Sequence, residues 1–313
     1  MGQQKVAKKR MKKKTQLVPY FFIAPWFFGF VAFILGPLLL SLYMSLHDWP
    51  VIGERVFVGF GNYIRMFTQD PMFYESLKIS FKFAGFFVPF NMIIALLLAF
   101  LISTDAKGVK IFRVIFYLPN ALSGVAISII WGWILNSKYG VLNYLLSLIG
   151  IDGPNWLTDP NWALIALVMA SAWTVGNMMI IFYTDIKQIP KDYYEAATLD
   201  GANSFQQFFL ITLPIITPTI LFNVVTSIIT ALQQLTLVML LTNGGPLRST
   251  YMYGLYVYEN AFRHHELGYA SANAWVMFFI ILALTLLILR SSSAWVYYEE
   301  TAKPKKKRKK AKQ

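Results

Sequence analysis

The chain has 313 residues, of which 57% are hydrophobic and only 14% charged, against about a quarter charged in an ordinary soluble domain. This composition excludes the ordinary soluble class and favours a membrane protein. The formal net charge of +13 does not indicate a nucleic-acid-binding face: of the 28 basic residues, seven lie in 1–14 and eight in 303–313, which leaves 13 against the 15 acidic residues.

The first predicted elements are a basic tail, residues 1–18, and an apolar run, residues 19–46. Lysines before an apolar run also occur in secretory signals, but this run is longer than a signal-peptide core and no small-residue cleavage site follows it. We therefore interpret the run as a retained membrane anchor. Basic tails beside apolar spans usually lie at the anionic cytoplasmic leaflet, so membrane lipid, not nucleic acid, is the expected partner of both tails.

Six apolar segments are long enough to cross a membrane, which takes about 20 apolar residues in a helix. They cover residues 19–46, 83–103, 114–135, 163–186, 213–241 and 271–290. Helices are expected because lipid offers backbone groups no other partner, and the continuous apolar runs lack the alternation of a barrel strand. The sequence thus predicts an all-α integral membrane protein with six transmembrane helices in a domain of residues 19–290.

Proline and glycine interrupt several of these spans. The residues are Pro25, Gly36, Pro37, Gly85, Pro89, Pro119, Gly124, Pro214 and Pro218. Two interpretations stay open at this point: ordinary kinks, which are common in membrane helices, or broken helices that line a transport pathway.

The basic residues also predict the orientation. If the N-terminus is inside, the inside segments are 1–18, 104–113, 187–206 and 291–313, which hold both basic tails, while the longer outside loops carry few basic residues. This distribution follows the positive-inside rule, and an even number of spans puts both termini in the cytoplasm. The tails 1–18 and 291–313 and the loop 187–212 are then cytoplasmic.

The cytoplasmic loop between the fourth and fifth spans has its own helix signals. Ile189-Pro190-Lys191-Asp192 is typical of a helix start, and the helix is expected to continue to Leu199. Gly201 suits the left-handed residue that ends a helix, and Asn203 or Ser204 can cap a second helix that leads into the fifth span. The loop is therefore predicted to form a short helix, a turn and a second helix at the membrane surface.

Glu195-Ala196-Ala197, then three residues, Gly201, nine residues, Ile211, one residue and Leu213-Pro214 resemble the "EAA" loop of ABC importer membrane subunits. The Asp200-Gly201-Ala202 form is common in the sugar-importing branch. The resemblance implies a coupling helix that docks in a cleft of a cytoplasmic ATPase dimer. The residues implied in this contact are Glu195, Ala196, Ala197, Asp200, Gly201 and Pro214.

Three further motifs resemble maltose-type permeases: Phe60-Gly61-Asn62-Tyr63, Leu118-Pro119-Asn120 and the turn at 241–246. The chain resembles the compact six-span members, which lack extra N-terminal spans and a large periplasmic domain, so a binding-protein contact through that domain is not implied. The resemblance does imply a bacterial or archaeal inner-membrane protein, an extracytoplasmic sugar-binding protein, and ATP and Mg in the partner ATPase. It also implies a second permease subunit, most simply a different related chain, with a homodimer as the open alternative.

Polar residues in the fifth span suggest where a substrate lies. Asn223, Ser227, Thr230 and Gln234 are spaced by four, three and four residues, which places them on one face of a helix. Such residues line a wet cavity or form interhelical hydrogen bonds, and spacing leaves both open. The resemblance favours a sugar cavity and adds candidates from the third and fourth spans. The full set is Asn120, Gly124, Trp173, Asn177, Asn223, Ser227, Thr230 and Gln234.

The chemistry of this set suits a neutral sugar, because amides and hydroxyls pair with sugar hydroxyls and a ring such as Trp173 packs on a pyranose. No span has a central charged residue, which argues against ionic substrates and against proton- or sodium-driven transport. The expected substrate is an oligosaccharide; the alternatives are another solute such as glycerol phosphate, or a multipass membrane protein without a transport role.

Enzymatic functions are disfavoured. The chain has no cysteine, and the pair His264-His265 is more typical of a solvated loop than of a metal site. It also lacks the GxxxxGK[ST] motif that cradles phosphates, so ATP hydrolysis must come from a partner, and no metal or cofactor is expected in this chain.

Overall fold

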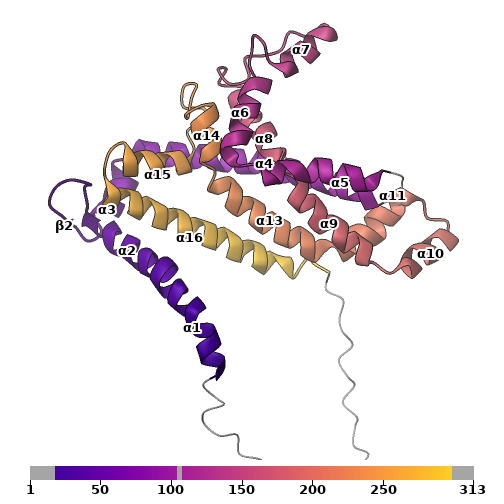
Figure 1. Cartoon of the computed structure of the whole chain (residues 1–313), viewed down its shortest axis with the longest axis horizontal. Helices are drawn as coiled ribbons and strands as arrows, with labels where there is room; N and C mark the ends of the chain where they lie inside the picture. Colours follow the sequence, from indigo (N-terminus) through magenta and orange to yellow (C-terminus); the bar gives the residue numbers. More distant parts are fainter. Residues whose placement is uncertain (1–17, 104–107, 298–313) are drawn as a thin grey trace, which may run out of the picture. The chain divides into compact units, whose positions relative to one another are not determined.

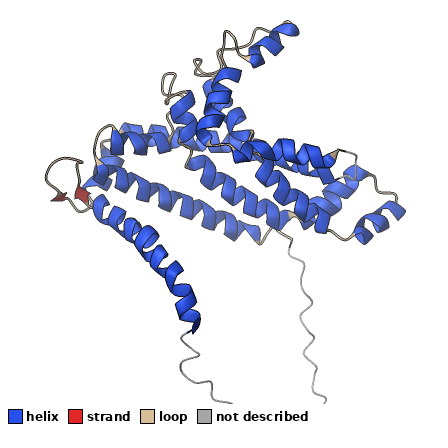
Figure 2. Ribbon diagram, viewed as in Figure 1, coloured by secondary structure: helices blue, strands red, loops and turns tan. Residues whose placement is uncertain are grey.

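The computed structural model describes residues 18–103 and 108–297, so most of both predicted basic tails lies outside the described residues. The chain divides into two compact units, one formed by Met1–Gln69 and Glu259–Val276 and the other by Asp70–Tyr258 and Met277–Gln313. The described residues are mostly helical, with one two-stranded ribbon (Figure 2). We call the unit formed by Met1–Gln69 and Glu259–Val276 the N-terminal unit, and the unit formed by Asp70–Tyr258 and Met277–Gln313 the central unit.

The N-terminal unit begins with a long helix that contains a π-helical turn. Its elements are α1 (Val18–Phe30), η2 (Val31–Leu35), α2 (Gly36–Ser45), β1 (His47–Asp48), β2 (Val56–Phe57) and α3 (Gly61–Thr68). The backbone N–H of Gly36 donates to the Val31 carbonyl, five residues back, directly before Pro37, which has no N–H. Because of this π-helical turn the helix continues through Gly36-Pro37 and does not end there. Pro19–Ser45 therefore forms one candidate membrane span.

The motif Phe60-Gly61-Asn62-Tyr63 has a structural role in this unit. The Asn62 amide donates to the carbonyls of Ser45 and His47, at 2.9 Å each, and the Tyr63 hydroxyl donates to Ser45 Oγ at 2.8 Å. These bonds tie the end of α2 to the start of α3 and satisfy carbonyls at the end of α2.

The central unit contains the remaining helices. They are α4 (Pro71–Ser103), α5 (Val109–Tyr117), η3 (Leu118–Ala121), α6 (Gly124–Ile134), α7 (Val141–Leu148), α8 (Ala163–Ala172), α9 (Gly176–Gln188), α10 (Lys191–Leu199), α11 (Ser204–Gln207), η4 (Phe208–Thr212), α12 (Leu213–Ile215), α13 (Thr217–Leu232) and α14 (Thr236–Leu241). Helices α15 (Tyr253–Phe262) and α16 (Leu267–Ser292) contribute residues to both units.

The core of the central unit is the packing of α4 against α9 and α13 (Figure 1). Ala95 and Ala99 of α4 and Met179 and Phe182 of α9 are completely buried in it, together with Ile216. The alanines let the helix axes approach closely, and the larger side chains fill the space between them. This cluster of buried side chains holds α4 and α9 together, and both helices flank the polar cavity described in the next subsection.

The predicted spans take two forms. Three are single helices, Pro19–Ser45, Pro71–Ser103 and Leu267–Ser292. Three are bent helix pairs: Val109–Ala121 with Gly124–Ile134 at 107°, Ala163–Ala172 with Gly176–Gln188 at 49°, and Ser204–Ile215 with Thr217–Leu232 at 69°. The chain therefore has three to six candidate spans. The helix of the second predicted span, α4, begins well before residue 83, where the sequence predicted that span to start.

Local chemistry explains two of the three bends. Pro119 stands in the 3₁₀ turn η3, and after the extended Leu122 the Ser123 hydroxyl caps α6 by accepting from the Ala126 N–H at 3.3 Å. Pro218 lies in the first turn of α13, directly after the break at Ile216. A proline therefore lies at each of these two breaks, and at the second it also stands in the first turn of the next helix.

The bend between α8 and α9 contains no proline. It is set by a close approach: a Cβ atom added to Gly176 would lie 2.7 Å from Tyr117 Cα and nearer still to the Phe116 carbonyl oxygen. Only glycine lets the start of α9 pass so close to the break in the third span.

Candidate functional site

The loop 187–212 forms the predicted helix, turn and second helix. Helix α10 runs from Lys191 to Leu199, and Gly201 has a φ of +83°, the left-handed conformation that glycine adopts without strain. The Ala202 N–H donates to the Ala197 carbonyl at 2.9 Å, and the Gly201 N–H donates to the Thr198 carbonyl at 3.1 Å. This pair of bonds is a Schellman motif, which satisfies two carbonyls at the end of α10.

The second helix has a complete capping box. Asn203 Oδ1 accepts from the Gln206 N–H at 2.9 Å, and Gln206 Oε1 accepts from the Asn203 N–H at 2.8 Å. The Gln207 amide donates to Thr198 Oγ1 at 2.9 Å, which holds α11 against α10. The prediction that Asn203 or Ser204 caps this helix is confirmed, with Asn203 as the cap.

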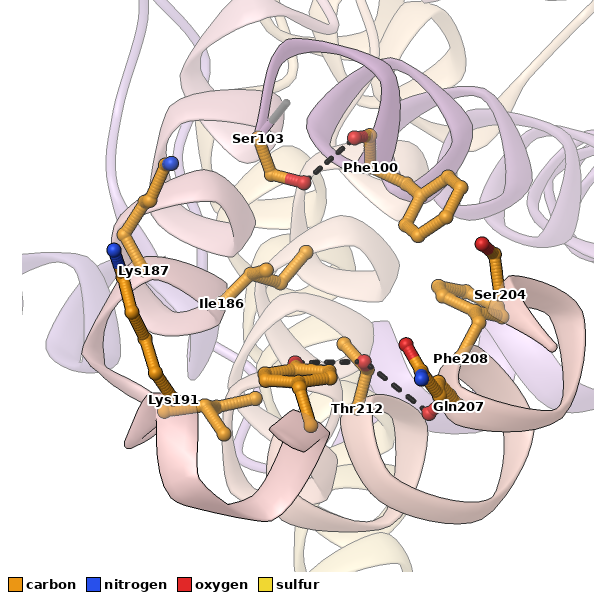
Figure 3. A pocket seen from close by; sticks show the side chains of 11 residues that line it. Phe100, Ser103, Ile186, Lys187, Lys191, Ser204, Gln207, Phe208 and Thr212 are labelled. Carbon is orange, nitrogen blue, oxygen red and sulfur yellow. Dashed lines mark hydrogen bonds between the residues drawn. The ribbon is translucent and has the colours of Figure 1, made fainter. Parts of the chain in front are cut away.

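A small pocket lies where this helix pair joins the longer helices (Figure 3). Its volume is about 270 Å³, and its lining includes Phe100 at the end of α4 and Lys187 of α9. The hydroxyls of Tyr194 in α10 and Thr212 in η4 are hydrogen-bonded at 2.9 Å, and Thr212 lies directly before α12 (Figure 3). Through this bond α10 is connected to the helices that lead into α13.

Most of the surface of α10 is exposed, although Tyr194 packs against the apolar cluster of α4 and α9. All residues of α10 are described and none is buried, and Leu199 at its end is 90% exposed. Glu195, Ala196, Asp200 and Gly201 are exposed and Ala197 is half-buried. Pro214 is half-buried in the first turn of α12.

A second cavity lies within the central unit, between α4, α9 and α13, with a volume of about 270 Å³. The residues that line it are Phe87, Asn91, Asn120, Thr174, Asn177, Met178, Ile181, Phe222, Asn223, Thr226, Ser227 and Thr230. Five of the eight candidates from the sequence are among them: Asn120, Asn177, Asn223, Ser227 and Thr230. We call this cavity the amide cavity, after the four asparagines in its wall.

The amide cavity combines apolar and neutral polar surface. Seven of its residues besides Asn91 carry amides or hydroxyls, and none of the described residues that line it is charged. Asn223 and Ser227 are 2% and 4% exposed, so their polar groups lie deep in the wall. Such a wall can form hydrogen bonds with an uncharged polar ligand, but it offers no counter-charge to an ion.

Three candidates lie outside the lining of the cavity. Gly124 faces α14, since an added Cβ would lie 3.4 Å from the Thr236 side chain. Trp173 meets Trp131 edge to face at 6.1 Å. Gln234 lies between α13 and α14, where its amide donates to Ser171 Oγ at 3.4 Å.

The prediction that Gln234 shares one helical face with Asn223, Ser227 and Thr230 is wrong, because α13 ends at Leu232. The reason is a contact far along the chain: an added Cβ at Gly254 of α15 would lie 2.7 Å from the Gln234 carbonyl oxygen, so α15 packs directly on the break. A period of 3.6 residues applies only as far as the helix continues.

Sequence reasoning missed three polar residues of the cavity: Asn91, Thr174 and Thr226. Asn91 had a usable signal, since it is the one amide in the predicted span 83–103 and polar groups inside spans tend to face a cavity or a partner. Among the described residues, no group of three or more His, Cys, Asp or Glu side chains could hold a metal ion.

The long apolar helices and the polar cavity between them define a multi-pass membrane permease. The family described as "Binding-protein-dependent transport system inner membrane component" matches residues 91–298, which is about two thirds of the chain. The chain therefore belongs to this family. It is the permease subunit of a binding-protein-dependent ABC importer of the inner membrane and is not itself the catalytic ATPase.

Individual relatives match over most of their length. The chain is 40% identical to the probable ABC transporter permease protein YesP of Bacillus subtilis (strain 168), over 91% of this chain and 93% of that protein. It is 31% identical to the trehalose/maltose transport system permease protein MalF of Thermococcus litoralis, over 88% and 94%. A crystal structure of a bacterial alginate ABC transporter, in complex with an alginate pentasaccharide-bound periplasmic protein, matches with a TM-score of 0.79 and 26% identity, over 89% and 95%.

Proposed function

We propose that this permease forms half of the translocation pathway for a neutral sugar, most simply an oligosaccharide, and that the amide cavity is its share of the substrate site. The observation that carries the proposal is the uncharged amide and hydroxyl lining of the cavity. Relatives named for neutral sugars, a trehalose/maltose system and a lactose system, support this proposal, whereas the alginate transporter is named for an acidic polysaccharide and does not. Asn120, Asn177, Asn223, Ser227 and Thr230 are the proposed contacts, while Gly124, Trp173 and Gln234 stay predictions from the sequence.

The size of the cavity supports a second permease subunit. Ligand pockets usually have volumes of about 300–1,000 Å³, and the amide cavity, at about 270 Å³, falls just below that range. A related permease that brings a second wall would enlarge the site to a size that fits more than one sugar unit. The proposed partners are therefore a second permease and an extracytoplasmic sugar-binding protein that delivers the substrate.

The membrane topology is part of the proposal. Six spans within residues 19–290 put both termini, the tails 1–18 and 291–313 and the loop 187–212 in the cytoplasm, in keeping with the distribution of basic residues. The three bent pairs would each count as one span. Helix α10 then faces the cytoplasm.

We propose that α10 is the coupling helix and docks in a cleft of the ATPase dimer, which holds ATP and Mg. Its exposed surface supports this role, with Glu195, Ala196, Ala197, Asp200 and Gly201 as the contacts and Pro214 as the start of the helix behind them. Closure of the ATPase dimer would move α10, and the Tyr194–Thr212 bond would pass the motion toward α13. Because α13 carries Asn223, Ser227 and Thr230, that motion would open the amide cavity to the inside.

The test is to copurify the chain with its partner subunits, reconstitute the complex in proteoliposomes with its binding protein, and measure sugar-stimulated ATPase activity. The panel contains maltose, maltotriose, trehalose, lactose, an alginate trisaccharide and glycerol 3-phosphate. We expect a neutral sugar to stimulate hydrolysis at least several-fold and the two anions not to do so. Stimulation by glycerol 3-phosphate alone or by the alginate trisaccharide alone would contradict the proposal.

A further inference from the structure

Arg113 is a cationic side chain without a counter-ion in the described part of the chain. It lies in α5, directly before the third predicted span, and is half-buried. Its guanidinium stacks on the ring of Tyr183 in α9, with 4.1 Å between the Cζ atom and the ring centroid, where α5 packs on α9 (Figure 1). The described residues give it neither an ion pair nor a hydrogen bond.

The unpaired guanidinium has donors that a ligand can reach. Nε is the only one of its nitrogens that is both buried and unpaired, so the two terminal nitrogens, which also have no partner among the described residues, are accessible. A guanidinium always carries its charge, and a charge in a partly buried place is costly when nothing pairs with it. Its terminal N–H groups can form two parallel hydrogen bonds with the oxygens of one phosphate or carboxylate. Arg113 is therefore suited to bind an anion.

Lys110 adds a second positive charge beside Arg113. It lies three residues earlier on the same face of α5 and is exposed. Asp185 of α9 comes two residues after Tyr183, which puts it on the other side of that helix. Its carboxylate accepts a hydrogen bond from the Thr219 hydroxyl of α13 instead. The two cations of α5 thus have room for an anion from outside the chain.

The exposed side of α5 is apolar, which indicates the kind of anion. Its large aliphatic and phenylalanine side chains that are more than half exposed are Ile111, Phe112, Val114 and Ile115. In a membrane such a surface contacts acyl chains, and basic side chains near the end of a span reach the headgroup phosphates. Basic sites between helices on the cytoplasmic side bind anionic lipid headgroups. A free phosphate would gain nothing from the apolar surface, whereas a phospholipid uses both parts.

We propose that Arg113 binds the phosphate of an anionic phospholipid of the cytoplasmic leaflet, with Lys110 beside it and the acyl chains on the exposed side of α5. The inference goes beyond the proposed function and takes from it only the membrane topology. Helix α5 leads directly into η3, which carries Asn120 of the amide cavity. A lipid held at Arg113 therefore fixes the helix that positions one wall of the cavity.

The experiment titrates the purified transporter complex in detergent with phosphatidylglycerol and counts the bound lipids by native mass spectrometry. The variants are Arg113→Gln, Arg113→Lys and, as the matched control, Arg290→Gln, which removes an exposed arginine from the last turn of α16 near the same proposed surface. We expect Arg113→Gln to raise the dissociation constant of the tightest-bound lipid about tenfold, equivalent to about 1.4 kcal/mol. Arg113→Lys should raise it about threefold, because lysine keeps the charge without the planar fork, and Arg290→Gln should leave it within twofold.

Two results of this titration would overturn the site. Equal weakening in Arg113→Gln and Arg290→Gln would mean that only the general surface charge attracts the lipid, and unchanged binding in Arg113→Gln would mean that Arg113 is not a contact. Inorganic phosphate and phosphatidylcholine test the ligand. Neither should displace phosphatidylglycerol at equal concentration, because the first lacks acyl chains and the second has no net negative charge. Displacement by inorganic phosphate would assign the site to a free phosphate and contradict the lipid.

Melting temperatures separate lipid binding from a structural role of Arg113. They are measured in nanodiscs of phosphatidylcholine with and without phosphatidylglycerol. A ligand that binds the folded state stabilises it, so phosphatidylglycerol should raise the melting temperature of the wild type and not that of Arg113→Gln. An equal rise in both, with a lower starting value for the variant, would show that Arg113 only packs on Tyr183. If Arg113→Gln does not assemble, Arg113→Lys should show a smaller rise than the wild type.

The leaflet is tested separately. The chain has no cysteine, so Lys110→Cys can be labelled with a membrane-impermeant maleimide. We expect labelling in inside-out vesicles and not in right-side-out ones, and the reverse would contradict the cytoplasmic leaflet. Lipid binding is measured without sugar. The lipid site can therefore fail while sugar-stimulated ATPase activity persists, and the proposed function can fail while the lipid site stands.

Discussion

The hydroxyl of Tyr194 in α10 lies 2.9 Å from Oγ1 of Thr212 in η4, and Thr212 directly precedes the helices that carry the polar wall of the amide cavity. Thr212 is buried, at 2% exposure, and its hydroxyl also lies 3.5 Å from the Gln207 carbonyl. This pair is a direct polar connection between the exposed helix α10 and the segment that leads into the fifth predicted span.

Removal of the Tyr194 hydroxyl tests this connection. In Tyr194→Phe the ring still packs, but the bond to Thr212 is lost, and a typical intramolecular hydrogen bond contributes about 1 kcal/mol. We expect sugar-stimulated ATPase activity to fall several-fold while ATPase assembly and basal hydrolysis are retained. Thr212→Val should lower the stimulated activity at least as far, because it also removes the contact with the Gln207 carbonyl, and the double variant should be no worse than Thr212→Val, since both single changes remove the shared bond. Fully additive losses would show that the two hydroxyls act separately.

Gly201 tests the turn that ends α10. Its φ of +83° costs a residue with a Cβ about 1–2 kcal/mol, and no atom lies within 4 Å of an added Cβ, so the effect of a substitution is conformational alone. We expect Gly201→Val to weaken copurification of the ATPase and to lower the melting temperature, and Gly201→Asn to be milder because asparagine tolerates this conformation.

Gly85→Ala is the matched control for Gly201, because Gly85 also has no atom within 4 Å of an added Cβ but lies inside the regular helix α4. Alanine is the better helix former, so this variant should be neutral or slightly stabilising. The proposed role of the turn would be contradicted if ATPase copurification and the melting temperature fell equally in Gly201→Asn, Gly201→Val and Gly85→Ala.

Gly176 tests how the breaks in two spans are held together. An added Cβ would lie 2.7 Å from Tyr117 Cα and 2.7 Å from the Asn120 amide nitrogen, and backbone cannot yield as a flexible side chain does. We expect Gly176→Ala to destabilise the complex by about 1–3 kcal/mol, the usual cost of overpacking, and to impair uptake by displacing Asn120. Thermal melting and transport assays measure the two effects. Gly132→Ala, with its nearest neighbour at an ordinary 3.6 Å, should change neither.

Variants of Gln234 and Asn177 test whether the substrate contacts lie in the amide cavity or on the helical face predicted from the sequence. Asn177 lines the amide cavity, whereas Gln234 lies outside it and donates to Ser171. We expect Asn177→Ala to raise the sugar concentration at half-maximal uptake about tenfold, equivalent to about 1.4 kcal/mol, and Gln234→Ala to leave it within twofold. The reverse pattern would restore Gln234 as a substrate contact and remove the amide cavity from the pathway.

The turn and the caps of the loop 187–212 could be predicted from the sequence because the interactions that shape them are local. The Schellman turn at Gly201 and the capping box of Asn203 and Gln206 join residues at most five positions apart. Their side-chain and backbone chemistry is the same in any surrounding. Small and charged side chains occupy most of the exposed surface of α10, while Tyr194 packs against the apolar cluster of α4 and α9.

The cavity depended on contacts that the sequence does not reveal. The regular spacing of Asn223, Ser227, Thr230 and Gln234 predicted four residues on one face, yet α15 packs on the Gln234 carbonyl and α13 ends two residues earlier. Asn91 lies far from the other cavity residues in the chain and reaches them because α4 packs against α9 and α13.

The sequence by itself therefore determined the membrane class, the helical segments, the family resemblance and the local geometry of α10 and its turn, because apolar length, capping and glycine conformation act over a few residues. Only the tertiary structure decided which polar side chains share one cavity. Those relationships depend on where helices break and how closely their backbones approach, and these are set by residues such as Gly176 and Gly254 that lie far away in the chain.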